Sequence, residues 1–206
     1  MTETIRDRAF RIGGFAALVA AAAIPVKIVA TLIELKTVTA GGLPKLALFV
    51  EAVEFGALVL VAFTLRRWMG EISRPLALLM LGAGVAGFAV GALANLVLVA
   101  GAPMSDDLDT ATSFVAAAGA AIWLLVGGTL IGRDDSQVPK LGWIGQVGGF
   151  GLLISAVELI LPPEMQARLA GGNLPLFVLL AGIFVLLYLV RLGRFMAFGH
   201  IPTGRI

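Results

Sequence analysis

Five polar side chains stand inside long apolar stretches of this sequence, where polar residues are rare. They are Lys27, Glu51, Glu54, Asn95 and Glu158. A charge in hydrocarbon costs roughly 2.5–3.5 kcal/mol on insertion scales, so such residues usually face a partner, a cavity or a ligand path. We therefore take these five as the candidate residues for binding a ligand or an ion.

Glu51 and Glu54 are three positions apart, which places them on one face of a helix. In a medium of low dielectric constant, two carboxylates this close do not both stay charged unless a cation lies between them. Lys27 is the obvious cation. In one interpretation the three residues form a buried ion pair that only fixes helix packing. In another they line an outward-facing pocket for a ligand or an ion, and in a third they belong to a proton or ion path across the membrane.

The composition indicates that the helices carrying these residues span a membrane. Of the 206 residues, 59% are hydrophobic and 14% are charged, whereas about 25% of residues are charged in a typical soluble domain. Six apolar stretches, approximately 12–33, 44–65, 76–100, 111–132, 141–161 and 174–190, are each long enough to cross a bilayer. We predict an all-α polytopic membrane protein in which residues 1–206 form one domain, a six-helix bundle with short connections and antiparallel neighbours.

The N-terminal segment also has features of a signal peptide, because Arg6, Arg8 and Arg11 precede an apolar run. The apolar pattern continues through Pro25 to Ile33, so we expect a retained helix.

Basic residues predict the orientation. The N-terminal tail, the second and fourth loops and the C-terminal tail hold 11 of them, namely Arg6, Arg8, Arg11, Arg66, Arg67, Arg74, Arg133, Lys140, Arg191, Arg194 and Arg205. The other three loops hold Lys36, Lys45 and Arg168. By the positive-inside rule, both termini are cytoplasmic. We expect a multi-pass protein of a bacterial-type inner (plasma) membrane.

Helical geometry places the polar residues at similar depths. At 1.5 Å per residue, Lys27 and Glu51 lie about 10 Å below the extracytoplasmic ends of their helices. Asn95 falls at a similar depth, whereas Glu54 is about one turn deeper and Glu158 about one turn shallower. Small residues recur at helical spacing before Asn95 and before Glu158 and mark close helix contacts, so both side chains should point into the protein. The cytoplasmic half offers only Gln146 and Thr129, which argues against a path through the whole membrane.

Other kinds of chemistry have little support. The sequence contains no cysteine and only one histidine, His200, which excludes thiolate sites and paired histidine ligands. No nucleophile and base pair is recognisable, so we expect neither an enzyme nor a cofactor or metal site. The basic residues are not interleaved with aromatic ones, so no nucleic-acid partner is expected. Asp106, Asp107 and Asp109 are interpreted as a solvated acidic loop on the outer side.

Two parts of the sequence resemble a known family. They are the stretch from Phe49-Val50-Glu51 to Leu76-Ala77-Leu78, and Val138-Pro139-Lys140-Leu141-Gly142-Trp143-Ile144-Gly145 ahead of a glycine-rich helix. Over helices 2 to 6 the chain resembles a family of bacterial six-span integral membrane proteins of unknown function. The resemblance implies the six-span fold and no activity.

The first functional hypothesis is a protein that binds, transports or senses a small solute or ion in an outward-facing polar pocket. Its partners would be the lipid bilayer and a small cationic or zwitterionic solute. The alternative is an accessory or assembly subunit of a larger membrane complex. In that case stripes of small residues would dock a membrane-protein partner or a second copy of the chain, and the buried charges would serve packing.

Overall fold

The protein is described by a computed structural model covering residues 3–37, 45–133, 139–170 and 174–199. Within these residues every secondary-structure element is a helix. The helices are α1 (Glu3–Thr37), α2 (Lys45–Ile72), α3 (Arg74–Val99), α4 (Asp106–Arg133), α5 (Pro139–Ile160), α6 (Pro163–Ala170) and α7 (Leu174–Phe198). The prediction of an all-α bundle is confirmed.

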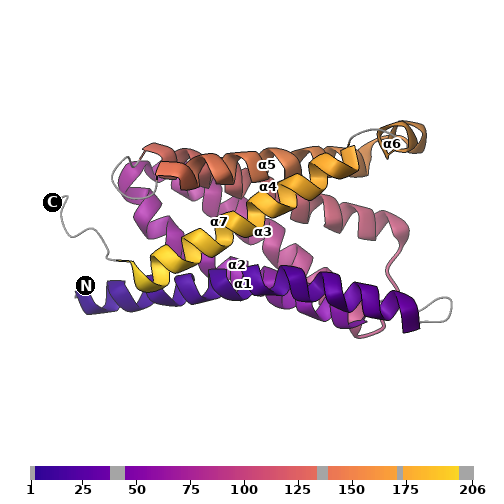
Figure 1. Ribbon diagram of the computed structural model, residues 1–206, viewed down its shortest axis with the longest axis horizontal. Coiled ribbons are helices and arrows are strands. Elements are labelled where there is room, and N and C mark those ends of the chain that lie inside the picture. The colour runs from indigo at the N-terminus through magenta and orange to yellow at the C-terminus, as the bar shows by residue number, and fades with distance from the viewer. Residues whose placement is uncertain (1–2, 38–44, 134–138, 171–173, 200–206) are drawn as a thin grey trace.

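The six long helices form a closed ring in which each packs against its neighbours in the sequence, and α7 completes the ring by packing against both α5 and α1. The start of α1 and the end of α7 lie at one end of the molecule, which we call the terminal end (Figure 1). The opposite end, where α1 and α3 finish and α2 and α4 begin, is called the loop end. Only Ser73 separates α2 from α3, as expected for short connections between antiparallel neighbours.

Among the residues that the structure describes, six helices are long and apolar enough to cross a membrane, spanning Arg8–Ile33, Lys45–Ile72, Arg74–Val99, Asp106–Arg133, Lys140–Ile160 and Leu176–Phe198. Large apolar side chains cover the outside of the ring, among them Leu60, Phe63, Leu93, Phe150 and Leu179. An exposed apolar surface of this kind requires lipid contact. The chain is therefore a multi-pass membrane protein.

The helices extend beyond the apolar stretches at the terminal end. α1 already begins at Glu3 and α7 continues to Phe198, although the apolar runs cover only 12–33 and 174–190. A helix ends where its backbone conformation changes and not where its side chains become polar. Arginines such as Arg11 and Arg191 continue the helical turns at this end.

Two segments predicted as loops are helical. The short connection expected between the apolar stretches 141–161 and 174–190 contains the helix α6, which starts at Pro163 because the first helical position has no need of an N–H donor. Asp106, Asp107 and Asp109 form the first turn of α4 and not a loop. The backbone N–H of Leu108 donates to Ser105 Oγ at 3.3 Å, and acidic side chains at a helix N-terminus interact favourably with its dipole.

The bundle is tightly packed toward the terminal end and open toward the loop end. α1 and α7 approach closely near the terminal end, where a Cβ added to Gly193 would lie 2.9 Å from the carbonyl oxygen of Gly14. From there α7 crosses diagonally toward α5 at the loop end (Figure 1). Fully buried side chains fill the terminal half, including Leu65, Met69, Met80, Leu130, Leu141, Leu192 and Met196. The divergence of α7 from α1 leaves space between the helices at the loop end.

Candidate functional site

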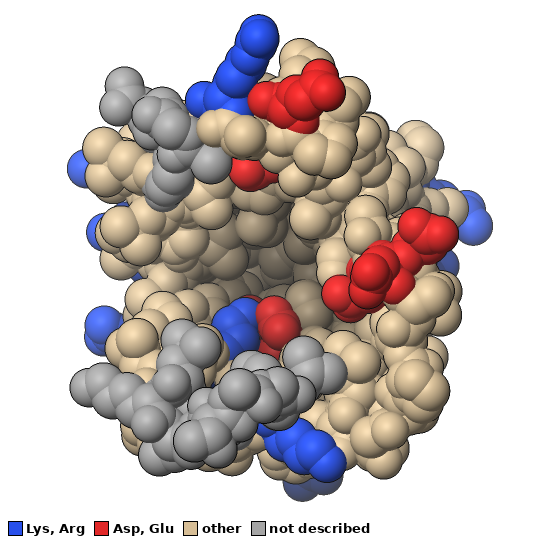
Figure 2. All heavy atoms as spheres, turned by 90° about the vertical axis from the view of Figure 1, so that its right-hand side faces the viewer, with Lys and Arg blue, Asp and Glu red and all other residues tan. Residues whose placement is uncertain are grey.

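A cavity of about 370 Å³ occupies this space, and all six long helices contribute to its walls. Figure 2 views the loop end and shows a deep hollow bordered by acidic and basic side chains. Asp109, Thr112 and Ser113 lie in the first turns of α4 and line the mouth of the cavity. Its inner end is formed by Leu58, Phe88, Trp123, Leu124 and Leu189. Because the packed terminal half lies beyond these side chains, the cavity is blind.

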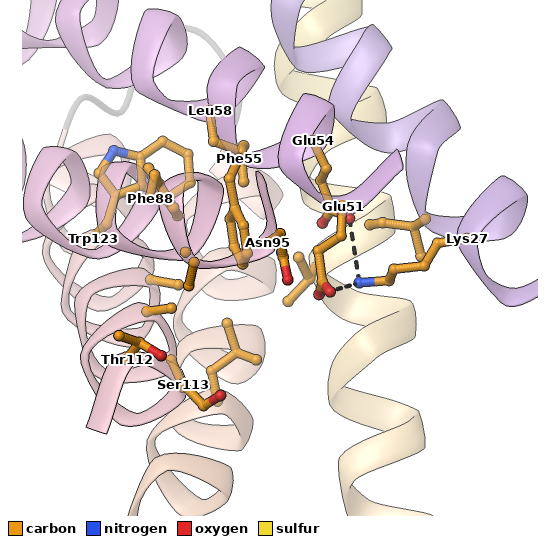
Figure 3. A pocket seen from close by; sticks show the side chains of 18 of the residues that line it. Lys27, Glu51, Glu54, Phe55, Leu58, Phe88, Asn95, Thr112, Ser113 and Trp123 are labelled. Carbon is orange, nitrogen blue, oxygen red and sulfur yellow. Dashed lines mark hydrogen bonds and ion pairs between the residues drawn. The ribbon is translucent and has the colours of Figure 1, made fainter. Parts of the chain in front are cut away.

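Lys27 joins both predicted carboxylates inside the cavity. Its Nζ donates to Glu51 Oε1 at 2.8 Å and lies 3.4 Å from Glu54 Oε2 (Figure 3). Lys27 comes from α1, whereas Glu51 and Glu54 are one turn apart on α2. The prediction that Lys27 is the cation between the two acids is confirmed.

The three charged side chains differ in their exposure. The side chains of Lys27 and Glu51 are 28% and 29% exposed, whereas that of Glu54 is only 10% exposed. Oε2 of Glu54 is buried and has no hydrogen-bond donor within the described part of the chain. A buried carboxylate oxygen normally accepts hydrogen bonds, because its desolvation is otherwise not compensated. The partner of Glu54 Oε2 within the described residues is Lys27 Nζ at 3.4 Å, a longer contact than the 2.8 Å between Lys27 Nζ and Glu51 Oε1.

Asn95 also lines the cavity, as its position among small residues predicted. It is 9% exposed and lies between Phe55 and the ion pairs of Lys27 (Figure 3). One turn before it, Gly91 lets Phe55 lie against α3, since a Cβ on Gly91 would be 2.6 Å from the Phe55 ring. The small residues of α3 therefore bring an aromatic ring of α2 and the amide of Asn95 to the same wall.

Glu158, the fifth candidate residue, is not brought to the cavity. α5 contributes Leu152 to the lining, and a residue six positions later on a helix points in a different direction, about 240° around the axis. The stripe before Glu158 instead packs against α7, where a Cβ on Gly148 would contact Val185. Glu158 is half-buried at the end of this stripe, and its assignment to the site stays a prediction without support from the cavity geometry.

Sequence reasoning missed the contribution of α4 to the mouth. Asp109, Thr112 and Ser113 share one face of a helix because they are three and four positions apart. The hydroxyl of Thr112 donates to the carbonyl oxygen of Asp109 at 3.0 Å. This spacing could have predicted that the three residues share a face, but only if the acidic segment had been assigned to a helix.

Three aromatic rings also escaped prediction, because aromatic residues in an apolar helix give no sign of facing a cavity. The rings of Phe55 and Phe88 are stacked with centroids 6.2 Å apart, and Phe88 meets Trp123 edge to face at 5.4 Å. All three residues line the cavity. The cavity therefore combines charged and polar groups toward the mouth with an aromatic and aliphatic inner end.

The charged lining residues are unequal in sign. Among the described lining residues, one side chain is basic, that of Lys27, and three are acidic, those of Glu51, Glu54 and Asp109. The lining therefore carries one formal positive and three formal negative charges. In the terminal half, Gln146 Nε2 donates to Thr129 Oγ1 at 3.1 Å. That contact belongs to the packing of α4 against α5.

No family model, curated protein or solved structure matches the chain. The resemblance to bacterial six-span proteins of unknown function accordingly stays a prediction. What the site can do has to be argued from its own geometry.

Proposed function

We propose that this protein binds a small organic solute in the blind cavity, as the substrate site of a transporter or the ligand site of a sensor. The observation that carries this proposal is the position of the Lys27, Glu51 and Glu54 group on the cavity wall. Charged side chains that serve only helix packing would be enclosed between the helices. Here the side chains of Lys27 and Glu51 are each more than a quarter exposed. Lys27 and Glu51 can therefore be reached from the mouth, and Glu54 lies behind them.

The shape of the cavity supports the same proposal. Small-molecule sites in proteins are mostly apolar concavities of roughly 300–1,000 Å³ with a few polar groups that orient the ligand. The volume of about 370 Å³, the aromatic inner end and the few ionisable groups correspond to this description.

We also propose that the loop end faces the extracytoplasmic side. Toward the terminal end, the C-terminal portions of α2, α4 and α7 carry basic residues, namely Arg66, Arg67, Arg133, Arg191 and Arg194. Basic residues of this kind favour the cytoplasmic side of a membrane. The solute would then enter from outside the cell, and the packed terminal half would close the route to the cytoplasm.

Filling the cavity tests the proposal. Gly182 of α7 lines the cavity, and a Cβ added there meets no atom within 4 Å. Gly182→Phe should therefore occupy the cavity without disturbing the helix packing. Gly56→Phe is the matched control, because Gly56 is exposed on α2 and an added Cβ there is equally free of contacts.

The measurement is the thermal stability of the purified protein in detergent with a panel of inorganic cations, amines, amino acids, carboxylates and alcohols. A ligand that binds only the folded state raises the melting temperature. We expect at least one probe to stabilise the wild type and Gly56→Phe but not Gly182→Phe. A wild type that responds to no probe, or a response that Gly182→Phe retains, contradicts the proposal and favours an accessory subunit whose charges serve packing.

A further inference from the structure

The geometry points to an organic amine as the ligand. Its ammonium group would take the position between Glu51 and Glu54 that Lys27 Nζ occupies, and its apolar body would lie on Phe55 and Phe88. This inference rests on the proposed function and names the chemical class that the cavity selects.

The charges of the lining favour a cation. A carboxylate or phosphate ligand would enter a space with three acidic side chains and one lysine that is already paired with two of them. An ammonium ion would instead reduce the excess of negative charge. Within the described residues no group of three histidine or acidic side chains is arranged to hold a metal ion. An organic cation with hydrogen-bond donors suits two carboxylates on neighbouring turns better than a metal ion.

Lys27 itself shows that one ammonium can serve both carboxylates. Its Nζ approaches Glu51 at 2.8 Å and Glu54 at 3.4 Å, so the two acids already frame a single cationic group. The contact with Glu54 is the longer one, and Oε2 of Glu54 accepts no hydrogen bond within the described residues. The lysine side chain is flexible and partly exposed. It can therefore swing toward the mouth when a ligand ammonium takes its place.

The aromatic wall suits the rest of such a ligand. Phe55 comes from the same helix as Glu51 and Glu54, one position after Glu54, and stacks on Phe88. Both rings lie across Asn95 from the ion pairs of Lys27 (Figure 3). Aromatic rings attract organic cations through their electron-rich faces and contact apolar groups equally well. The cavity volume lies near the lower end of the range for small-molecule sites, which fits a compact amine and not a lipid with two chains.

Three probes of the same shape test the charge of the ligand in the wild-type protein. They are 3-phenylpropylamine, 3-phenylpropanol and 3-phenylpropionate, with affinities measured by calorimetry in detergent. We expect the amine to bind at least about tenfold more tightly than the alcohol, because hydrogen bonds to charged groups are the stronger ones. The carboxylate should bind most weakly. Equal binding of the three probes, no binding of the amine, or tightest binding of the carboxylate overturns the inference.

Two variants identify the groups that bind the ammonium. Glu54→Gln should remove the preference for the amine and leave the affinity for the alcohol unchanged, whereas Glu164→Gln, an exposed position on α6, should change neither. Lys27→Met should show a larger rise in melting temperature with the amine than the wild type does, because the ligand replaces the missing ammonium. If Lys27→Met instead loses binding of 3-phenylpropionate, the lysine is the receptor for an anion and the inference is wrong.

The outcomes separate the inference from the proposed function. If the amine fails but the alcohol or the carboxylate binds, and Gly182→Phe abolishes that binding, the cavity is a solute site with a different selectivity. If Gly182→Phe leaves the binding of every probe intact, the proposed site itself is wrong.

Discussion

Lys27 of α1 and Glu54 of α2 approach to 3.4 Å between Nζ and Oε2 within the loop half of the bundle, although Glu54 is nearly buried. The same ammonium donates to Glu51 Oε1 at 2.8 Å. One cation from α1 thus pairs with two carboxylates one turn apart on α2. Since each carboxylate depends on the same ammonium, the three residues should respond to substitution as one unit.

Removing the cation alone should cost more stability than removing all three charges. Lys27→Met leaves two neighbouring carboxylates without a cation, and breaking a buried ion pair costs about 3–5 kcal/mol. We expect a loss of about 3 kcal/mol, at the lower end of that range, because Lys27 and Glu51 are partly exposed. The measurement is the unfolding of the purified protein in detergent.

The triple variant Lys27→Met, Glu51→Gln, Glu54→Gln is the comparison, because it removes the repulsion together with the attraction. It should be more stable than Lys27→Met. Identical melting temperatures of wild type and Lys27→Met would show that the lysine contributes no net attraction.

The pairing of Lys27 with Glu51 and Glu54 could be predicted from the sequence because placing a charged side chain in hydrocarbon costs free energy. Charges at matching depths in adjacent apolar helices have few ways to be compensated, and pairing is the commonest. Asn95 was predicted for a related reason, since the small residues spaced before it mark the buried face of α3. The six spans followed from the length and composition of the apolar stretches.

The orientation of the bundle can be tested with reporters that are active on only one side of a membrane. A reporter fused after residue 206 and another inserted beside Asp106 should report opposite sides, because α7 ends and α4 begins at opposite ends of the ring. The positive-inside rule further predicts that the reporter after residue 206 is cytoplasmic. The same side for both reporters would contradict the ring of six antiparallel spans.

The close crossing of α3 and α4 should depend on Gly87. A Cβ at this position would lie 2.8 Å from the Cα of Gly119, so backbone would have to move. Gly87→Ala should therefore destabilise the bundle by about 1–3 kcal/mol, as overpacking usually does. Gly82→Ala is the control on the same helix, because an added Cβ there meets no atom within 4 Å.

The control variant should keep or slightly raise the melting temperature, since alanine favours helix over glycine by up to about 1 kcal/mol. If Gly87→Ala and Gly82→Ala shift the melting temperature alike, the two helices do not cross at Gly87 and Gly119.

The remaining parts of the site could not be predicted because they depend on how the helices are rotated and inclined. An aromatic residue in an apolar helix gives the same sequence pattern whether its side chain faces lipid, the protein core or a cavity, and this holds for Phe55, Phe88 and Trp123. The divergence of α7 from α1, which opens the cavity, follows from close contacts such as Gly14 with Gly193 and has no signature in hydropathy. For Glu158 the stripe of small residues correctly marked a close helix contact, with α7, but such a contact does not indicate whether the residue at its end faces a cavity.

Asp109 should assist the binding of a cationic ligand from the mouth, at longer range than Glu54. Its side chain is exposed in the first turn of α4 and lines the cavity, so its attraction for a cation is weakened by water and by salt. Asp109→Asn should lower the affinity for 3-phenylpropylamine about two- to fivefold at low ionic strength, in keeping with exposed ion pairs. The loss should vanish at high salt, whereas that of Glu54→Gln should persist. Asp106→Asn removes an equal charge outside the cavity lining, and an equal loss in that variant would show that Asp109 acts only through the net charge of the loop end.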